Sequence, residues 1–228
     1  MMSDLKLIQF LTQFLTEDRN AAMDRVLTER TRYITVVLED IFQSQNASAV
    51  LRTCDCFGIQ DVHIIENYND YDVNPDVALG SDKWLTMHKY NDQTENTSEA
   101  LKHLKQNGYR IIATTPHTDD ILLDDFNLED GKFALVFGTE QSGISETVEE
   151  YADAFLRIPM YGFTESYNIS VSAAICLHDL VKRLKNSSVA WQLTSDERNE
   201  LKYEWLMKSI KKSELVVERY YKESICLK

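Results

Sequence analysis

Three polar segments carry residues whose types and spacing could do chemistry. In the first, Asn46 precedes Arg52 by six residues, which places an amide near a permanent cation. In the second, GTEQSG at residues 138–143, two glycines flank Glu140 and let the backbone approach a ligand closely. The third, residues 160–172, holds Gly162 and a set of hydroxyl and amide side chains: Thr164, Ser166, Asn168, Ser170 and Ser172. The pattern predicts a ligand site made of polar side chains and exposed peptide groups.

Each segment also has a purely structural interpretation. A strand-to-helix turn would use glycine anyway, and GTEQSG lacks the GKT or GKS of a phosphate loop. No GxGxxG dinucleotide fingerprint occurs in the chain. Ser166 and Asn168 could serve only to cap the helix that follows them, and Arg52 could pair with Asp55 or Glu140 on the surface. Each segment alone is weak evidence for a ligand site, and only the three together are strong evidence.

Hydrophobic periodicity predicts the elements that position these residues. Short β-branched runs predict strands at 33–40, 61–66, 84–90, 109–115, 133–138 and 154–160. Apolar residues three and four apart predict helices at 4–30, 44–58, 98–108, 145–152, 171–181 and from about Ser195 onward. The alternation predicts an α/β fold with a mostly parallel sheet covered by helices on both faces. Each polar segment follows a predicted strand, where such sheets bind ligands.

Composition indicates a globular protein of one main domain. The 228 residues are 43% hydrophobic and 27% charged, and no apolar run approaches the roughly 18 residues that span a bilayer. The N-terminus carries Asp4 and no cleavage site, so we expect a cytoplasmic protein without membrane attachment. Four cysteines without a CxxC pair or clustered histidines give no reason to expect a metal. We expect a helical extension at 1–30, a domain at 31–186 and a helical tail at 187–228.

The net charge of −13 argues, taken alone, against nucleic acid as a partner. The acidity is concentrated in the centre, because residues 61–153 hold 20 acidic and 6 basic side chains. Residues 179–228 hold 8 acidic and 11 basic side chains, and the N-terminal segment adds four arginines: Arg19, Arg25, Arg30 and Arg32. The charge distribution therefore allows a basic binding face made of the two termini.

In this order, Asn46 with Arg52, FGTEQSGIS and IPMYGFTESYNISVSAA resemble the three motifs of the SPOUT superfamily of methyltransferases. Within it the chain resembles the TrmH family of RNA ribose 2′-O-methyltransferases, over roughly residues 32–184. NASAVLRTCDCFG, GSDKW and SYNISVSAA are most similar to members that modify the D-loop guanosine at tRNA position 18. The resemblance implies a C-terminal trefoil knot, a homodimer with shared active sites, and S-adenosylmethionine bound in the knot.

The resemblance also implies residue roles. Arg52 is the expected catalytic residue, either as a base with a lowered pKa or, as we prefer, as a clamp on phosphate and developing oxyanion. It should lie in the N-terminal half of its helix and point into a cleft shared with Glu140, Ser166 and Asn168. Asn46 should hold Arg52 or the RNA, and Glu140 should orient Arg52 or the polar residues of the third motif through charge-assisted hydrogen bonds. Cofactor contacts are expected mainly from backbone at Thr115, Gly138, Ile158, Met160 and Tyr167, and RNA contacts from Arg25, Arg30 and Lys83.

Two other functions remain possible at this stage. The same chemistry could act on ribosomal RNA or on another tRNA position, although only about 30 residues precede the first strand, which favours tRNA. Alternatively, the chain could be a catalytically silent RNA-binding protein on this fold. The presence of all five expected catalytic residues favours an enzyme with tRNA and a second copy of itself as partners.

Overall fold

The computed structural model describes residues 5–116, 121–139 and 142–226 of the 228-residue chain. The chain divides into two compact units: Thr31–Trp191 forms one, and the segments up to Arg30 and from Gln192 onward form the other. Residues 187–191 group with the larger unit, where Thr31 Oγ1 donates a 2.6 Å hydrogen bond to the Trp191 carbonyl. The three-part division expected from the sequence remains a prediction.

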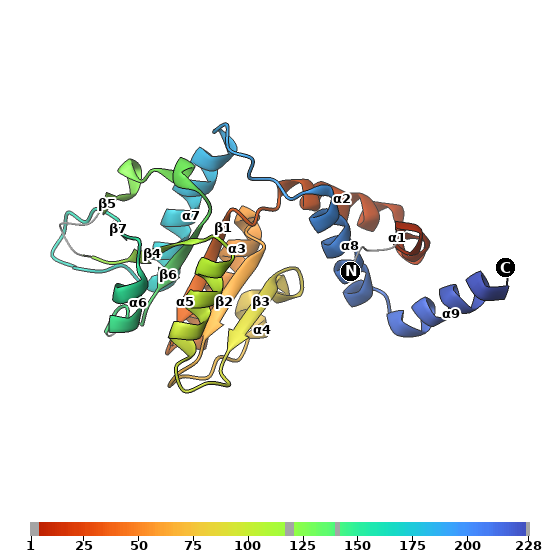
Figure 1. The fold of residues 1–228 in the computed structure, drawn as a ribbon, viewed down its shortest axis with the longest axis horizontal. Coiled ribbons are helices and arrows are strands. Elements are labelled where there is room, and N and C mark those ends of the chain that lie inside the picture. Colours follow the sequence, from red (N-terminus) through yellow and green to blue (C-terminus); the bar gives the residue numbers. More distant parts are fainter. Residues whose placement is uncertain (1–4, 117–120, 140–141, 227–228) are drawn as a thin grey trace. The chain divides into compact units, whose positions relative to one another are not determined.

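A sheet of 7 strands, parallel at every pairing, forms the centre of the larger unit (Figure 1). Its strands are β1 (Ile34–Glu39), β2 (Asp61–Ile65), β3 (Thr86–Tyr90), β4 (Arg110–Thr114), β5 (Ile121–Leu122), β6 (Phe133–Phe137) and β7 (Ala154–Arg157). They lie in the order β3-β2-β1-β6-β4-β7-β5. Val36 of β1 lies opposite Val62 of β2 on one side and Leu135 of β6 on the other. The expected parallel α/β sheet is confirmed.

Helices cover both faces of this sheet (Figure 1). They are α3 (Ser44–Phe57), α4 (Pro75–Ala78), α5 (Asn96–Gln106), α6 (Glu146–Tyr151) and α7 (Ile169–Lys185). Because side chains alternate along a strand, Val36 and Leu38 pack in the core under α3 and α7. Val37 packs in the second core, under α5 and α6. The helix that carries Asn46 and the helix that Asn168 precedes therefore share one face.

The ends of α3 and α7 follow from single residues. Gly58 ends α3 as expected, with a φ of 77° and its amide bonded back to the helix. Asn168 caps α7, and its side chain accepts from the Ser170 amide. The carboxyl end of β7 is thereby joined to a helix whose first turn is fixed by a polar side chain.

The smaller unit consists of α1 (Leu5–Thr12), α2 (Glu17–Glu29), α8 (Ser195–Ser209) and α9 (Ser213–Cys226). The prediction of a single helix at 4–30 is wrong, because the helix is interrupted between Thr12 and Glu17. Thr16 caps the second helix by accepting from the Arg19 amide at 3.3 Å, and Asn20 donates to the Thr12 carbonyl at 2.9 Å. These local hydrogen bonds compete with a continuous helix. Trp205 and Leu201 of α8 are buried in this unit.

Two connections contain elements that the periodicity does not predict. Between β2 and β3, Asn74 caps the one-turn helix α4, and a 3₁₀ turn follows at Ser81–Lys83. Before β6, the chain forms the two-residue strand β5 and 3₁₀ turns at Leu123–Asp125 and Leu128–Asp130. Elements this short hold too few residues to show a period.

A helix that crosses a bilayer must be both long and apolar. Within the described ranges, none of the helices meets this requirement.

Candidate active site

The strand order brings the expected site segments to one edge of the sheet. β1, β6, β4 and β7 are consecutive neighbours and all parallel, so the chain leaves each of them at the same edge. The segments that follow carry Asn46, Gly138, Thr115 and residues 158–168, respectively. Thr115 continues the pairing one step further, because its amide donates to the Leu156 carbonyl at 3.0 Å. Four chain segments with polar groups thus surround one edge, as in other open parallel sheets with ligand sites.

Asn46 and Asn168 meet directly across this edge. The Asn168 Nδ2 group donates to Asn46 Oδ1 at 3.1 Å, joining residues that are 122 positions apart. Asn168 Oδ1 accepts from the Ser170 amide at 2.9 Å and from the Ser170 hydroxyl at 2.6 Å. Asn168 thus caps α7 while it contacts Asn46, and the structure brings two of the five expected catalytic residues together.

Arg52 is exposed on α3 but lies farther along the helix than expected. It is the ninth of 14 residues, so it lies in the second half of α3 and not in the first. Six residues of helix separate it from Asn46 by about 9 Å of rise and about 120° of rotation. Among the described residues, Arg52 forms no hydrogen bond or ion pair. Its orientation into a shared cleft stays a prediction, and Glu140 lies outside the described residues.

The turn after β6 requires glycine at position 138 for steric reasons. A Cβ on Gly138 would lie 2.1 Å from the Gly143 carbonyl oxygen and 2.5 Å from the Ile144 nitrogen. The turn is closed by paired hydrogen bonds between Thr139 and Gly143, of 2.8 and 3.1 Å, and Gly143 has a φ of 74°. Gly138 is therefore required by the backbone of its own turn, whether or not a ligand is bound.

The segment after β7 is open to solvent. Ile158 and Met160 are half-buried, whereas Ser166 is exposed and Tyr167 is 43% exposed. Tyr161 and Phe163 are also almost fully exposed. A segment with this many exposed aromatic rings is typical of a binding surface.

The expected RNA contacts differ in accessibility. Arg25 is exposed on α2, and Lys83 is exposed in the turn before β3. Arg30 is only 1% exposed, and its guanidinium lies 5.3 Å from the centre of the Trp205 ring. The expectation for Arg30 is wrong in this structure, because a buried guanidinium cannot bind a phosphate in solution. Its position at the end of a helix and before a strand gave no sign of this burial.

Three buried carboxylates at the ends of β1 and β2 were missed: Glu39, Asp40 and Glu66. Asp40 has a φ of 49°, which is rare outside glycine. Its carboxylate accepts from the amides of Asn67 and Tyr68 at 2.7 and 2.8 Å. The only sign of this burial in the sequence was that Glu39 and Asp40 directly follow an apolar run. Acidic residues at such a position are more simply explained by a solvated turn.

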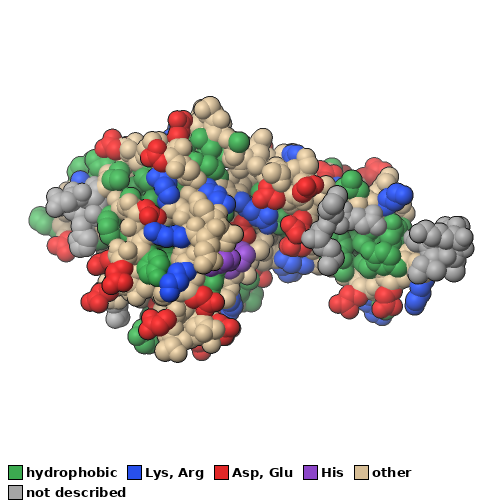
Figure 2. Space-filling view, in the orientation of Figure 1, with side chains coloured by type: hydrophobic (Ala, Val, Ile, Leu, Met, Phe, Trp, Pro, Cys, Tyr) green, Lys and Arg blue, Asp and Glu red, His purple; other side chains and the backbone are tan. Residues whose placement is uncertain are grey.

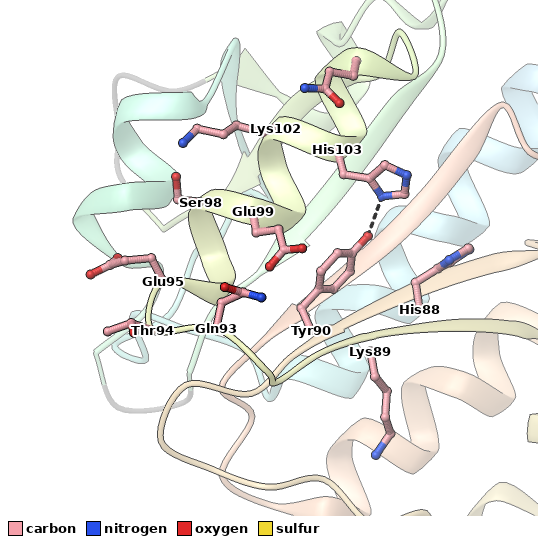
Figure 3. Close-up of a pocket in the computed structure, with 11 residues that line it drawn as sticks. His88, Lys89, Tyr90, Gln93, Thr94, Glu95, Ser98, Glu99, Lys102 and His103 are labelled. Atoms are coloured by element: carbon pink, nitrogen blue, oxygen red, sulfur yellow. Dashed lines mark hydrogen bonds between the residues drawn. The ribbon is translucent and has the colours of Figure 1, made fainter.

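A cavity of about 990 Å³ lies on the other face, between β3 and α5 (Figure 3). The Tyr90 hydroxyl is hydrogen-bonded to His103 Nδ1 at 2.8 Å and to His63 Nδ1 at 2.9 Å. Burial lowers the pKa of His63 to about 3, with the neighbouring His88 adding to the effect, and burial raises the pKa of Tyr90 to about 12. Both groups are therefore neutral near pH 7, and none of the expected site residues lines this cavity.

Charge is mixed over the larger unit. In the view of Figure 2, acidic and basic side chains are interspersed on the larger unit and do not form one continuous basic face. Among the described residues, no group of three or more His, Cys, Asp or Glu side chains could hold a metal ion.

The parallel sheet and the polar groups at its carboxyl edge define a class of α/β enzymes that act on ligands bound by the loops after the strands. The chain belongs to the SpoU rRNA Methylase family, whose pattern it matches over residues 33–178.

Named relatives agree with this membership. The chain is 43% identical over 212 residues to a tRNA (guanosine(18)-2′-O)-methyltransferase of Borreliella burgdorferi, covering 93% of this chain and 95% of the relative. It is 34% identical to a protein of the same name from Thermus thermophilus, covering 75% and 86%. The solved A. aeolicus TrmH/SpoU tRNA modifying enzyme superposes with a TM-score of 0.75 at 26% identity, covering 86% and 98%.

Proposed function

We propose that this chain transfers a methyl group from S-adenosylmethionine to a ribose 2′-hydroxyl of tRNA, at the D-loop guanosine 18. The observation that carries the proposal is the hydrogen bond between Asn46 and Asn168, which joins two of the three motif segments at one sheet edge. The names of the Borreliella and Thermus relatives, at 43% and 34% identity, support the choice of substrate.

The carboxyl edge offers a suitable cradle for the methyl donor. Thr115, Gly138 and Ile158 follow three adjacent strands, and all three are partly accessible, so their peptide groups can meet a ligand. Met160 and Tyr167 would complete the contacts from the segment before α7. S-adenosylmethionine, when bound, supplies an electrophilic methyl group there. The turn at Gly138 is fixed by backbone contact, which keeps its peptide groups in place without a ligand.

The protein's own side chains would have to activate the ribose hydroxyl, which is a weak nucleophile. Because a guanidinium carries positive charge and five N–H donors, we assign Arg52 to an RNA phosphate and to the negative charge that develops on the 2′-oxygen. Asn46, Asn168 and Ser166 would hold the ribose by hydrogen bonds. Glu140 would orient Arg52 through a charge-assisted hydrogen bond. The methyl–sulfur bond breaks as the methyl–oxygen bond forms, S-adenosylhomocysteine leaves, and the hydroxyl proton passes to solvent water. The alternative is that Arg52 itself accepts this proton as a base.

We infer a homodimer with a C-terminal trefoil knot as the active form. The exposed rings of Tyr161 and Phe163, together with Val171 on α7, support a second protomer at this surface. Arg25 and Lys83 are accessible for phosphate contacts. Sedimentation or light scattering at micromolar concentration should give twice the mass of the chain, and a stable monomer would contradict a shared active site.

Methyl transfer to defined tRNA transcripts tests the function. Incubation with S-adenosylmethionine labelled in the methyl group should label a transcript with an ordinary guanosine 18. A transcript with 2′-deoxyguanosine at that position alone should stay unlabelled. Equal labelling of both would move the target to another nucleotide, and no labelling of either tRNA or ribosomal RNA would contradict the enzyme assignment.

A further inference from the structure

Glu39 ends β1 and is only 2% exposed, yet its carboxylate is fully engaged by hydrogen-bond donors. Oε1 accepts from the Thr97 hydroxyl and from the Ser145 hydroxyl, each at 2.7 Å. Oε2 accepts from the Ser145 amide at 3.1 Å. One side chain at the end of the central strand thus contacts α5 and the residue that begins α6.

A carboxylate at this depth needs such donors to offset the loss of its hydration. No cation pairs with Glu39 among the residues that the structure describes, so hydroxyl and amide groups provide the whole compensation. An apolar side chain could fill the same volume without that cost. The arrangement therefore indicates that the role of Glu39 is to orient the groups that donate to it.

Ser145 is the residue that Glu39 orients most closely. Its hydroxyl donates to Glu39 and, at the same time, accepts from the Val148 amide at 3.2 Å as the cap of α6. Glu39 fixes the direction of that hydroxyl and also holds the Ser145 amide. The last residue of the segment that begins at Gly138 is consequently tied to β1.

The strand register places Gly138, at the start of this segment, level with Glu39. Leu38 of β1 lies opposite Phe137 of β6, so Glu39 comes level with Gly138. The Gly138–Gly143 backbone contact closes the turn, and Glu39 anchors its exit through Ser145. A hydrogen-bonded line continues from Glu39 through Thr97 to Asn67 and on to the Asp40 carboxylate.

We propose that Glu39 is a positioning residue for the described parts of the cofactor turn, residues 138–139 and 142–145, acting through Ser145 and not by touching the reacting atoms. This inference rests on the proposed function, because it assigns the segment to S-adenosylmethionine. Its effect belongs to cofactor affinity, because the turn that Gly138 and Gly143 close can shift as a unit relative to β1 when Ser145 is released. The rate at saturating cofactor depends on the side chains of α3 and α7 and should change little.

Glu39→Gln tests the inference with almost unchanged volume. In one orientation of the new amide its NH2 group faces the Ser145 amide and that bond is lost; in the other the NH2 group donates to the Thr97 and Ser145 hydroxyls, so the Ser145 hydroxyl can no longer donate and its direction changes. Either orientation alters the way in which Ser145 is held. Calorimetry with S-adenosylmethionine should give a Kd at least about tenfold higher, which corresponds to about 1.4 kcal/mol. The kcat for tRNA methylation at saturating cofactor should stay within about threefold of the unmodified chain.

Thr97→Val is the matched control, because it removes a bond to the same carboxylate but only on the side of α5. It should lower the melting temperature while leaving the Kd for S-adenosylmethionine within about twofold. An equal loss of affinity in both variants, or an unchanged Kd in Glu39→Gln, would overturn the positioning role. If Glu39→Gln does not fold, Ser145→Ala decides by the same comparison. Failure of the unmodified chain to bind S-adenosylmethionine would instead refute the proposed function.

Discussion

At the scale of single residues, the proposed site uses side chains that also have a structural role. Asn168 caps α7 and also holds Asn46, so its amide is already oriented before any RNA arrives. Such pre-orientation matters because a hydrogen bond assembled in advance costs less entropy when the substrate binds. Arg52 differs, since it is exposed and is held by no described partner. Its guanidinium is free to take an RNA phosphate.

Arg52→Ala should therefore separate binding from catalysis. The variant should keep the fold and S-adenosylmethionine affinity, and methyl transfer should fall at least about a hundredfold, as expected when one charge stabiliser is removed. Arg52→Lys should restore little of the methyl-transfer rate if a bidentate contact with phosphate or ribose matters. Single-turnover assays measure both, with Lys182→Ala, an exposed cation on α7, as the control. A fully active Ala variant would remove Arg52 from the mechanism.

Gly138→Ala should disturb the cofactor segment by steric contact alone. The new Cβ would lie 2.1 Å from the Gly143 carbonyl oxygen, so the turn must open. Affinity for S-adenosylmethionine should fall at least about tenfold, while circular dichroism shows an intact sheet. Gly162→Ala is the control, because a Cβ there meets no atom closer than 4.0 Å. Unchanged calorimetric affinity in Gly138→Ala would place the cofactor elsewhere.

At the scale of elements, the sequence was informative wherever a period was long enough. Every strand of the sheet except β5, together with α3, α5 and α7, follows from its apolar spacing, and Gly58 marks the end of α3. The break before α2 was missed because it depends on the Thr16 hydroxyl and not on hydrophobicity. The buried roles of Glu39 and Arg30 depend on partners distant in the chain, which no local pattern encodes. Motif resemblance supplied the expected site residues, which stay a prediction, whereas tertiary packing decides which of them meet.

The buried imidazole of His63, on β2, should make the stability of the folded chain depend on pH. His63 has a pKa of about 3 in the folded chain, because it is buried, whereas an unfolded histidine titrates near 6.5. Between these values the unfolded chain binds more protons, so acid favours unfolding. The stability that His63 contributes is complete above about pH 6.5 and declines as the pH falls, by up to about 1.4 kcal/mol per unit.

His63→Asn removes this titration and keeps a polar atom near the Tyr90 hydroxyl. Urea unfolding between about pH 7 and about pH 5 should show a smaller fall in stability for the variant than for the unmodified chain. The comparison of slopes cancels the packing that the smaller side chain loses at every pH. Parallel slopes would mean that the pKa of His63 is the same in the folded and the unfolded chain.

At the scale of the whole molecule, an acidic protein must still bind a polyanion. The acidity belongs to residues 61–153, whereas residues 179–228 carry more basic than acidic side chains. Much of the basic charge of the larger unit is already paired, as in the 2.8 Å contact of Lys105 with Asp153 and the 2.9 Å contact of Arg32 with Asp61. The terminal helices are therefore the expected source of phosphate contacts beyond the site itself.

Lys211 and Lys212, exposed between α8 and α9, provide the sharpest test of that expectation. Replacing both by Ala, alone or with Arg25→Ala, should weaken tRNA binding severalfold at moderate salt, because a phosphate without its cationic partner keeps its condensed counterions. The slope of log Kd against log salt should flatten by about one for each phosphate that is no longer bound. Affinity for S-adenosylmethionine should not change, since that site is assigned to the larger unit. Lys105→Ala, at the end of α5, is the control with one exposed lysine removed. Filter binding across a salt series measures the slopes, and identical slopes for all variants would mean that the termini do not bind the RNA.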